Sequence, residues 1–147
     1  MYYDHKYTQW LVFFGLKSAL YGRKRGVKKL IRKVRMGDTD ATGAIYFTSL
    51  LRFAVEAFEE ALEAKGLQIQ SAPFLLPIVH AEADFIAPIA LGDVLDISFV
   101  QKNGSSSISV KYEFCRNGTL IATASIVHVA IERKTGKKVA VSSELKL

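Results

Sequence analysis

Residues 47–65, FTSLLRFAVEAFEEALEAK, decide the fold, because they predict the one long helix of the chain. Apolar residues recur there at the i, i+3, i+4, i+7 spacing of a buried helix face. They are Leu50, Leu51, Ala54, Ala57, Phe58, Ala61 and Leu62. Glutamates occupy most of the remaining surface, and Lys65-Gly66 supplies a last-turn cation and a C-terminal glycine. A helix with one apolar face must bury that face against a second layer.

Segments of alternating or β-rich composition surround this helix and predict strands. The first has Leu30, Val34 and Met36 on one face and Ile31 on the other. Asn-Gly pairs at 103–104 and 117–118 predict tight hairpins, because both residues of such a pair can adopt positive φ. Prolines lie in or beside only one segment, 74–85, which is therefore expected to be bent, bulged or at a sheet edge. The predicted strands cover residues 27–36, 74–85, 94–100, 107–114, 120–131 and 138–141.

The order of strand, helix and then several antiparallel strands predicts an α+β fold, in which an antiparallel sheet curls around one long central helix. With 147 residues, half of them hydrophobic, the chain can bury one core without metal or disulfide. Its one cysteine, Cys115, excludes a disulfide framework within the chain and favours a reducing, cytoplasmic setting. We therefore divide the chain into an N-terminal extension, residues 1–26, and one domain, residues 27–147.

The positive charge of the chain is concentrated in and just after its N-terminal extension. Residues 1–36 hold ten Lys and Arg against one acid, a net charge of +9, and the remaining residues hold ten against thirteen, a net charge of −3. The apolar run WLVFFGL at residues 10–16 is too short to span a bilayer, which takes about 20 residues. The extension is expected to pack on its own domain or a second subunit, or to contact a membrane peripherally. No module for nucleic-acid binding accompanies it.

Two carboxylates precede the helix, in the segment GDTDATGAIYF at residues 37–47. In a structural interpretation, Asp40 or Thr42 caps the helix or its leading turn, and Asp38 is an exposed turn residue. In a catalytic interpretation, Asp40 attacks a carbonyl or activates water, while backbone N–H groups from Gly43 to Phe47 bind the developing oxyanion. The residue types alone leave both interpretations open.

GDTDATGAIYF, the helix segment EAFEEAL and PIVHAEADFIAPIALGD at residues 77–93 together resemble the hot-dog fold acyl-CoA thioesterases of the 4-hydroxybenzoyl-CoA thioesterase group. Within that group the chain is most similar to the 1,4-dihydroxy-2-naphthoyl-CoA thioesterases. The resemblance covers about residues 29–141. It implies a hot-dog domain that assembles as a homodimer or homotetramer, with each active site between two subunits.

The resemblance also implies site residues. The second aspartate of the motif, Asp40, corresponds to the catalytic nucleophile or general base of the group, and the oxyanion donor corresponds to the N–H of Phe47, with Tyr46 beside it. Some relatives have His or Tyr where this chain has Phe47, so the donor here is expected to be the main chain and the helix dipole alone. Gly43 is assigned to substrate binding.

Other polar residues are weaker candidates. His80 is predicted to line an acyl pocket, and Arg133, Lys134 and Lys137, with Lys138, to hold the phosphates of coenzyme A. Glu56 is expected to be solvated or salt-bridged, and His128 to lie on the sheet surface or at an interface. The histidines are scattered without metal-ligand spacing, so no metal or redox cofactor is expected, and coenzyme A is part of the substrate.

We therefore predict an acyl-CoA thioesterase that hydrolyses an aromatic or a medium- or long-chain acyl-CoA thioester, 1,4-dihydroxy-2-naphthoyl-CoA being one candidate. The alternative is a noncatalytic acyl-binding or membrane-associated scaffold that keeps the same fold.

Overall fold

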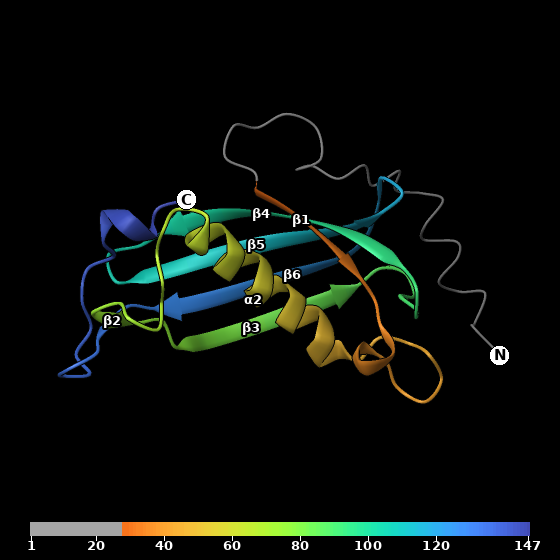
Figure 1. Cartoon of the computed structure of the whole chain (residues 1–147), viewed down its shortest axis with the longest axis horizontal. Coiled ribbons are helices and arrows are strands. Elements are labelled where there is room, and N and C mark those ends of the chain that lie inside the picture. Colours follow the sequence, from red (N-terminus) through yellow and green to blue (C-terminus); the bar gives the residue numbers. More distant parts are fainter. Residues whose placement is uncertain (1–27) are drawn as a thin grey trace.

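Residues 28–147 are described in this computed structural model, so the predictions for the N-terminal extension and its boundary lie outside the described residues. The described chain contains one long helix and two antiparallel sheets. The larger sheet has five strands in the order β1-β4-β5-β6-β3, and β2 and β7 form a two-stranded sheet (Figure 1). The elements are β1 (Lys28–Lys33), η1 (Met36–Asp38), α2 (Phe47–Glu63), β2 (Phe74–Leu75), β3 (Ile78–Phe85), β4 (Val94–Asn103), β5 (Ser107–Arg116), β6 (Thr119–Val129), β7 (Ile131–Glu132) and η2 (Ser143–Leu145).

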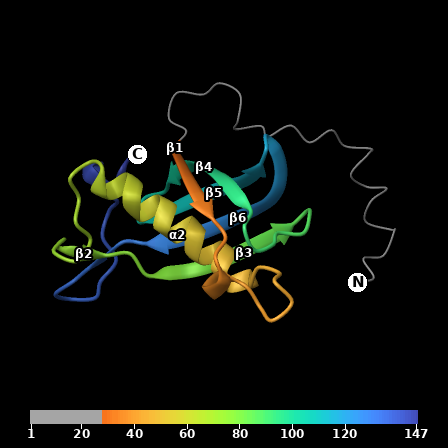
Figure 2. The same cartoon turned by 45° about the vertical axis from the view of Figure 1, so that its right-hand side comes forward.

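The α2 helix lies across one face of the five-stranded sheet, as two views of the molecule show (Figures 1 and 2). Its buried face carries the apolar residues predicted for it, except that Leu51 is only half-buried, and also Phe53. Phe58 meets Phe99 of β4 edge-on at 6.3 Å between ring centroids, and Phe99 in turn contacts Tyr112 of β5 at 5.5 Å. The predicted α+β arrangement, one helix against an antiparallel sheet, is confirmed.

The first and the last predicted strands differ from the structure. The first strand ends at Lys33 rather than at residue 36, because the Asp38 side chain accepts the Arg35 N–H and closes η1, which leaves Met36 exposed. The predicted strand 138–141 is wrong. Only Lys138 forms a bridge, to Ile131, while Val139 and Val141 donate to carbonyls of separate segments.

The proline-containing segment 74–85 is split in two, and β3 is an edge strand, as predicted. Pro77 separates β2 from β3, and a register shift between Ile78 and His80 forms a bulge. β3 pairs with β6 on one side only among the described residues. Apolar side chains on the helix-facing side of β3 stay exposed, Ile78 by 46% and Phe85 by 45%. The edge of the sheet next to α2 is therefore open and apolar.

Candidate active site

Asp40 lies in the turn that leads into α2 and is held by its own loop. Its Oδ1 accepts hydrogen bonds from the N–H and the hydroxyl of Thr42, at 2.8 and 2.6 Å, and from the N–H of Ala44 at 3.2 Å. The Thr42 hydroxyl chiefly, and then the Thr42 N–H, lower the pKa of Asp40 below its ordinary value. No donor to Oδ2 is found within residues 28–147. Asp40 is thus an ionised carboxylate at neutral pH with one oxygen available for chemistry.

The Asp40 loop is fastened to the turn that follows β3. Ile45 N–H donates to Ile89 O, and Leu91 N–H donates to Gly43 O, both at 2.9 Å. Gly43 has φ of 81°, in the left-handed region that favours glycine, so the turn depends on this residue. Because the Gly43 N–H donates to the Asp40 carbonyl at 3.0 Å, it is not available as an oxyanion donor. The assignment of Gly43 to substrate binding stays a prediction.

The start of α2 offers free backbone donors, as the catalytic interpretation requires. Tyr46 is the N-cap, and its N–H is already taken by the Asp38 carbonyl at 2.9 Å. Ser49 N–H donates to Tyr46 O at 3.0 Å. In the described part of the chain, no acceptor is found for the N–H groups of Phe47 and Thr48. The available donor is therefore the Phe47 N–H, with Thr48 rather than Tyr46 beside it.

Asp40 caps its leading turn, as the structural interpretation allows, since its Oδ1 accepts the N–H groups of Thr42 and Ala44. It does not cap α2, and Asp38 is not the exposed turn residue of that interpretation. Asp38 is only 4% exposed, accepts the Arg35 N–H at 2.8 Å, and pairs with Arg52 of α2. Burial alone would raise the pKa of Asp38, but these two hydrogen bonds and the positive charges of Arg52 and Arg32 outweigh it and lower the pKa. Asp38 therefore ties the Asp40 loop to the first half of the helix.

We expect Asp38→Asn to lower the free energy of unfolding by about 1–3 kcal/mol at pH 7, because it leaves a buried hydrogen-bond network without its charge. Since the pKa of Asp38 is lower in the folded state, its stabilising effect is present above the ordinary value of 3.8 and is lost as the pH falls below it. Urea unfolding at pH 7 and pH 3 measures both effects. The exposed Asp84→Asn is the control, and equal stabilities of wild type and Asp38→Asn at pH 7 would contradict this role.

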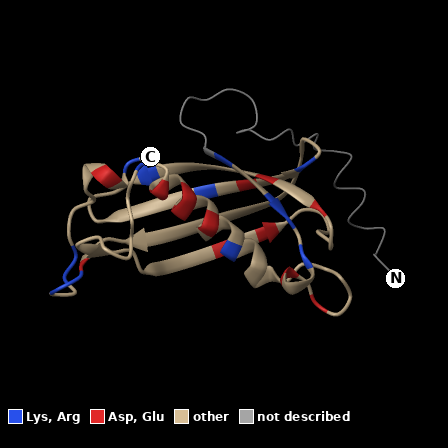
Figure 3. Cartoon of the chain, viewed as in Figure 1, with Lys and Arg blue, Asp and Glu red and all other residues tan. Residues whose placement is uncertain are grey.

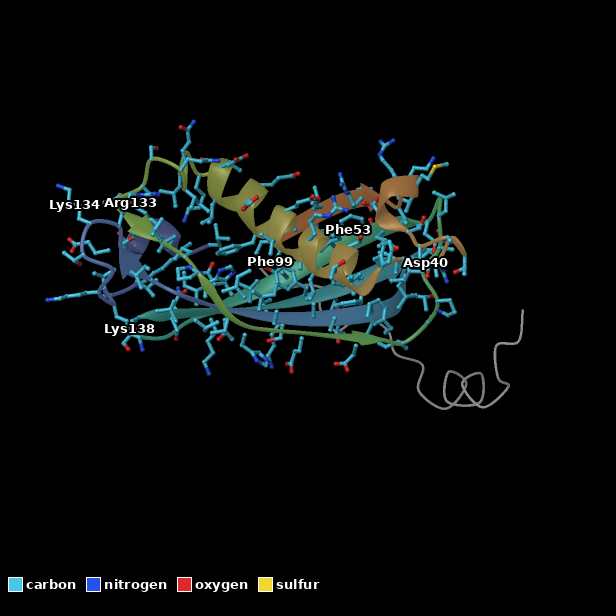
Figure 4. All side chains as sticks on the ribbon, turned by 90° about the horizontal axis from the view of Figure 1, so that it is seen from below. Asp40, Phe53, Phe99, Arg133, Lys134 and Lys138 are labelled. Carbon is cyan, nitrogen blue, oxygen red and sulfur yellow. The ribbon has the colours of Figure 1, made fainter. Side chains whose placement is uncertain are left out.

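The other predicted residues lie away from Asp40. His80 is exposed on the β3 face opposite the helix, 3.4 Å from Glu82. Figure 3 shows in blue the Lys and Arg residues of the described chain, which include those of a hairpin at one end of the molecule. Arg133, Lys134 and Lys138 lie at the opposite end of the molecule from Asp40 (Figure 4). Arg133 is already engaged, because its guanidinium donates to the carbonyls of Ala72 and Ile69 at 2.9 Å. Within one subunit the basic hairpin at residues 133–138 cannot act at Asp40.

Glu56 is salt-bridged, as expected. It lies 3.4 Å from Arg32 and 3.9 Å from Arg52, and both guanidinium groups stand over the Phe53 ring. This charged cluster surrounds the same Arg52 that holds Asp38.

His128 does not lie on the sheet surface, the first of the two positions predicted for it. It is 4% exposed rather than on the sheet surface, and its ring stacks on Phe58 at 5.2 Å. The sequence did contain a signal for this burial. His128 is an even number of residues from Ala122, Ala124 and Ile126, so it lies on the same, buried face of β6. It lines a cavity of about 320 Å³ between the second half of α2 and the start of β3.

Among residues 28–147, no three His, Cys, Asp or Glu side chains are grouped so that they could hold a metal ion. No helix in that range is long and apolar enough to cross a membrane.

Comparison with known proteins bears on this arrangement of loop, helix and sheet. A family model described as the thioesterase-like superfamily matches residues 34–147. The chain belongs to this superfamily.

Proteins similar to this thioesterase include hydrolases and a thioesterase of 1,4-dihydroxy-2-naphthoyl-CoA. A 1,4-dihydroxy-2-naphthoyl-CoA hydrolase from Prochlorococcus marinus strain NATL2A is 35% identical over 130 residues, which are 80% of this chain and 84% of the relative. The hydrolase of the same description from Synechococcus sp. strain WH7803 is 38% identical over 122 residues, 75% and 80% of the two chains. The crystal structure of a 1,4-dihydroxy-2-naphthoyl-CoA thioesterase from Synechocystis has a TM-score of 0.75 at 31% identity, covering 81% of this chain and 92% of that one. The predictions of a hot-dog fold and a thioester hydrolase are confirmed.

Proposed function

We propose that this thioesterase hydrolyses an aromatic acyl-CoA, with 1,4-dihydroxy-2-naphthoyl-CoA as its substrate. The observation that carries the proposal is an ionised carboxylate, Asp40, with a free Oδ2, in the loop that ends at the unpaired N–H of Phe47. Relatives at 35% and 38% identity that are described as hydrolases of this thioester support the choice of substrate.

In the proposed reaction, the Phe47 N–H donates a hydrogen bond to the thioester carbonyl, and the positive end of the α2 dipole stabilises the oxyanion. Asp40 then acts in one of two ways. As a nucleophile it forms an acyl anhydride and expels coenzyme A thiolate, and water hydrolyses the anhydride. As a general base it takes a proton from the water that attacks the carbonyl; the C–S bond then breaks, and coenzyme A leaves as the thiol after taking up that proton. Both routes use the same oxygen, Oδ2, and return Asp40 to its ionised state.

The proposed enzyme is a homodimer, or a tetramer built from such dimers, in which the free edge of β3 pairs with β3 of a second subunit. Support comes from the unpaired edge and from exposed apolar side chains beside it, among them Ile78, Phe85 and Phe47, the last 65% exposed. Antiparallel pairing about a two-fold axis exchanges the strand ends. The Ile78 end of one subunit then lies near the Phe85 end of the other, beside the turn that holds the Asp40 loop.

The same exchange of ends gives the basic hairpin a function. Lys134, Lys137 and Lys138 follow β7, which pairs with β2 just before the Ile78 end of β3, so the dimer brings them toward the catalytic loop of the other subunit. We assign them to the phosphates of coenzyme A bound at that loop. A cytoplasmic setting and peripheral membrane contact through the N-terminal extension stay predictions.

Release of free thiol from a panel of thioesters tests the proposal. The panel contains 1,4-dihydroxy-2-naphthoyl-CoA, benzoyl-CoA, palmitoyl-CoA and an acyl carrier protein thioester. We expect kcat/KM to be highest for the dihydroxynaphthoyl thioester, by at least tenfold over the others. Preference for palmitoyl-CoA would contradict the aromatic substrate, and binding without turnover of any thioester would favour the noncatalytic scaffold.

A further inference from the structure

The cavity beside His128 has the composition of a ligand site and lies outside the catalytic loop. Its wall is mostly apolar, with one imidazole and one carboxyl group, and its volume of about 320 Å³ lies at the lower end of the range for small-molecule sites. The lining residues are Val55, Phe58, Glu59, Ile69, Leu76, Ile78 and His128.

The imidazole of His128 has one hydrogen-bonding atom left over. Its Nδ1 lies 3.1 Å from the Leu76 carbonyl. Because a carbonyl oxygen only accepts, Nδ1 carries the proton, and Nε2 of the neutral ring is a pure acceptor. Burial chiefly lowers the pKa of His128, although the Leu76 carbonyl opposes this, so the ring stays neutral at pH 7. Nε2 is buried and has no partner among the described residues. A ligand that satisfies this atom must bring a hydrogen-bond donor.

We propose that this cavity binds the aromatic ring of the acyl group, and that Nε2 of His128 accepts a hydrogen bond from the ring hydroxyl farthest from the thioester carbonyl. This inference rests on the proposed function and assigns a hydroxylated, rather than a plain, aromatic acyl group to the site. An apolar wall accommodates the ring, and the single buried acceptor selects the hydroxyl, because a ring without it leaves Nε2 unpaired. His128 is thus a specificity-determining residue.

The cavity serves the catalytic loop of the second subunit. Val55 and Glu59, the first and last cavity residues of α2, are eight and twelve residues from Phe47, so they lie about 12 and 18 Å from it along the helix axis. In an aroyl thioester the carbonyl is bonded directly to the ring. The aroyl group is therefore too short to reach from the Phe47 N–H to the cavity of the same subunit. The exchange of ends in the proposed β3 dimer brings the Ile78 side of the cavity toward the other subunit's Asp40 loop instead.

A pair of substrates and a pair of variants test the hydroxyl contact. The substrates are 1,4-dihydroxy-2-naphthoyl-CoA and 1-hydroxy-2-naphthoyl-CoA, which differ only in the hydroxyl far from the carbonyl. His128→Asn keeps a donor for the Leu76 carbonyl and removes the acceptor at Nε2. We expect wild type to prefer the dihydroxy substrate in kcat/KM and His128→Asn to reduce this preference about 10–100-fold. His80→Asn, the same change at an exposed position, should leave the preference unchanged.

Mixed dimers test which subunit supplies the cavity. Asp40→Asn subunits are added in excess to His128→Asn subunits, so that nearly every active carboxylate sits in a mixed dimer. If the site combines Asp40 of one subunit with His128 of the other, the mixed dimer holds one intact site and shows the wild-type preference. If both residues act within one subunit, the mixed dimer keeps the reduced preference of His128→Asn, and the assignment to the second subunit is overturned.

These measurements distinguish a failure of the hydroxyl contact from a failure of the proposed function. Turnover of both substrates by wild type, with the same preference in His128→Asn, overturns the hydroxyl contact and leaves the proposed function standing. Turnover of neither substrate overturns both. Should His128→Asn unfold, the ¹⁵N signal of His128 in wild type is the substitute measurement. We expect it to shift on adding 1,4-dihydroxy-2-naphthoate and not 1-hydroxy-2-naphthoate, and equal shifts with both compounds would overturn the contact.

Discussion

Asp40→Asn is expected to lower kcat for the dihydroxynaphthoyl thioester by about 10³-fold, with a much smaller change in KM. The amide keeps the size of the side chain and can still accept hydrogen bonds from Thr42 and Ala44. It supplies neither a nucleophilic oxygen nor a base, and a general base alone contributes 10²–10⁴-fold. Single-turnover and steady-state assays of thiol release with the purified protein measure the loss.

The lowered pKa of Asp40 adds a pH signature to this prediction. A carboxylate acts in its ionised form, so kcat/KM should be level across neutral pH and fall only below the ordinary carboxyl value of 3.8. Asp96→Asn, a change of the same kind on β4, is the control for loss of one negative charge. Asp40→Asn activity within threefold of wild type would rule out Asp40 as the catalytic carboxylate.

Phe53→Ala is expected to lower the free energy of unfolding by about 3–5 kcal/mol, the largest stability effect that we predict. Phe53 is fully buried under the first half of α2, so truncation leaves a cavity in the core. The guanidinium groups of Arg32 and Arg52, at 4.9 and 5.6 Å from the ring centroid, also lose the aromatic face that they cover.

Urea unfolding followed by circular dichroism measures this loss. Phe53→Leu keeps much of the apolar volume without the ring and should cost about 1.5 kcal/mol, so the difference between the two variants separates the cavity from the aromatic contact. A loss below about 1 kcal/mol in Phe53→Ala would show that the core closes around the missing ring. Because Arg52 also holds Asp38, a loosened Arg52 should lower kcat in Phe53→Ala even below its unfolding temperature.

The sequence predicted the elements that local chemistry controls. The helix followed from the spacing of its apolar residues, and the hairpin at Asn117-Gly118 from a pair that adopts positive φ, 52° and 79°. The edge position of β3 followed from Pro77. Each of these signals lies within a few residues of the structure that it predicts.

What the sequence did not reveal depends on contacts between distant residues. The buried position of Asp38 requires Arg52, fourteen residues away, and Leu76 and His128 are 52 residues apart. The placement of Arg133, Lys134 and Lys138 far from Asp40 follows from the strand order, which no local pattern contains. Composition could identify these cations as candidates for the phosphates of coenzyme A, but it carried no information on where the fold places them relative to Asp40.

The unpaired N–H at the start of α2 has a consequence for protein engineering. This N–H belongs to the peptide backbone, whereas the Phe47 side chain, 65% exposed in one subunit, belongs to the apolar surface that we assign to the proposed dimer. Any residue except proline at position 47 keeps the N–H that we propose as the oxyanion donor, while its side chain changes that surface. A library randomised at codon 47 would therefore vary the side chain next to the proposed thioester site while it keeps the backbone N–H that polarises the carbonyl.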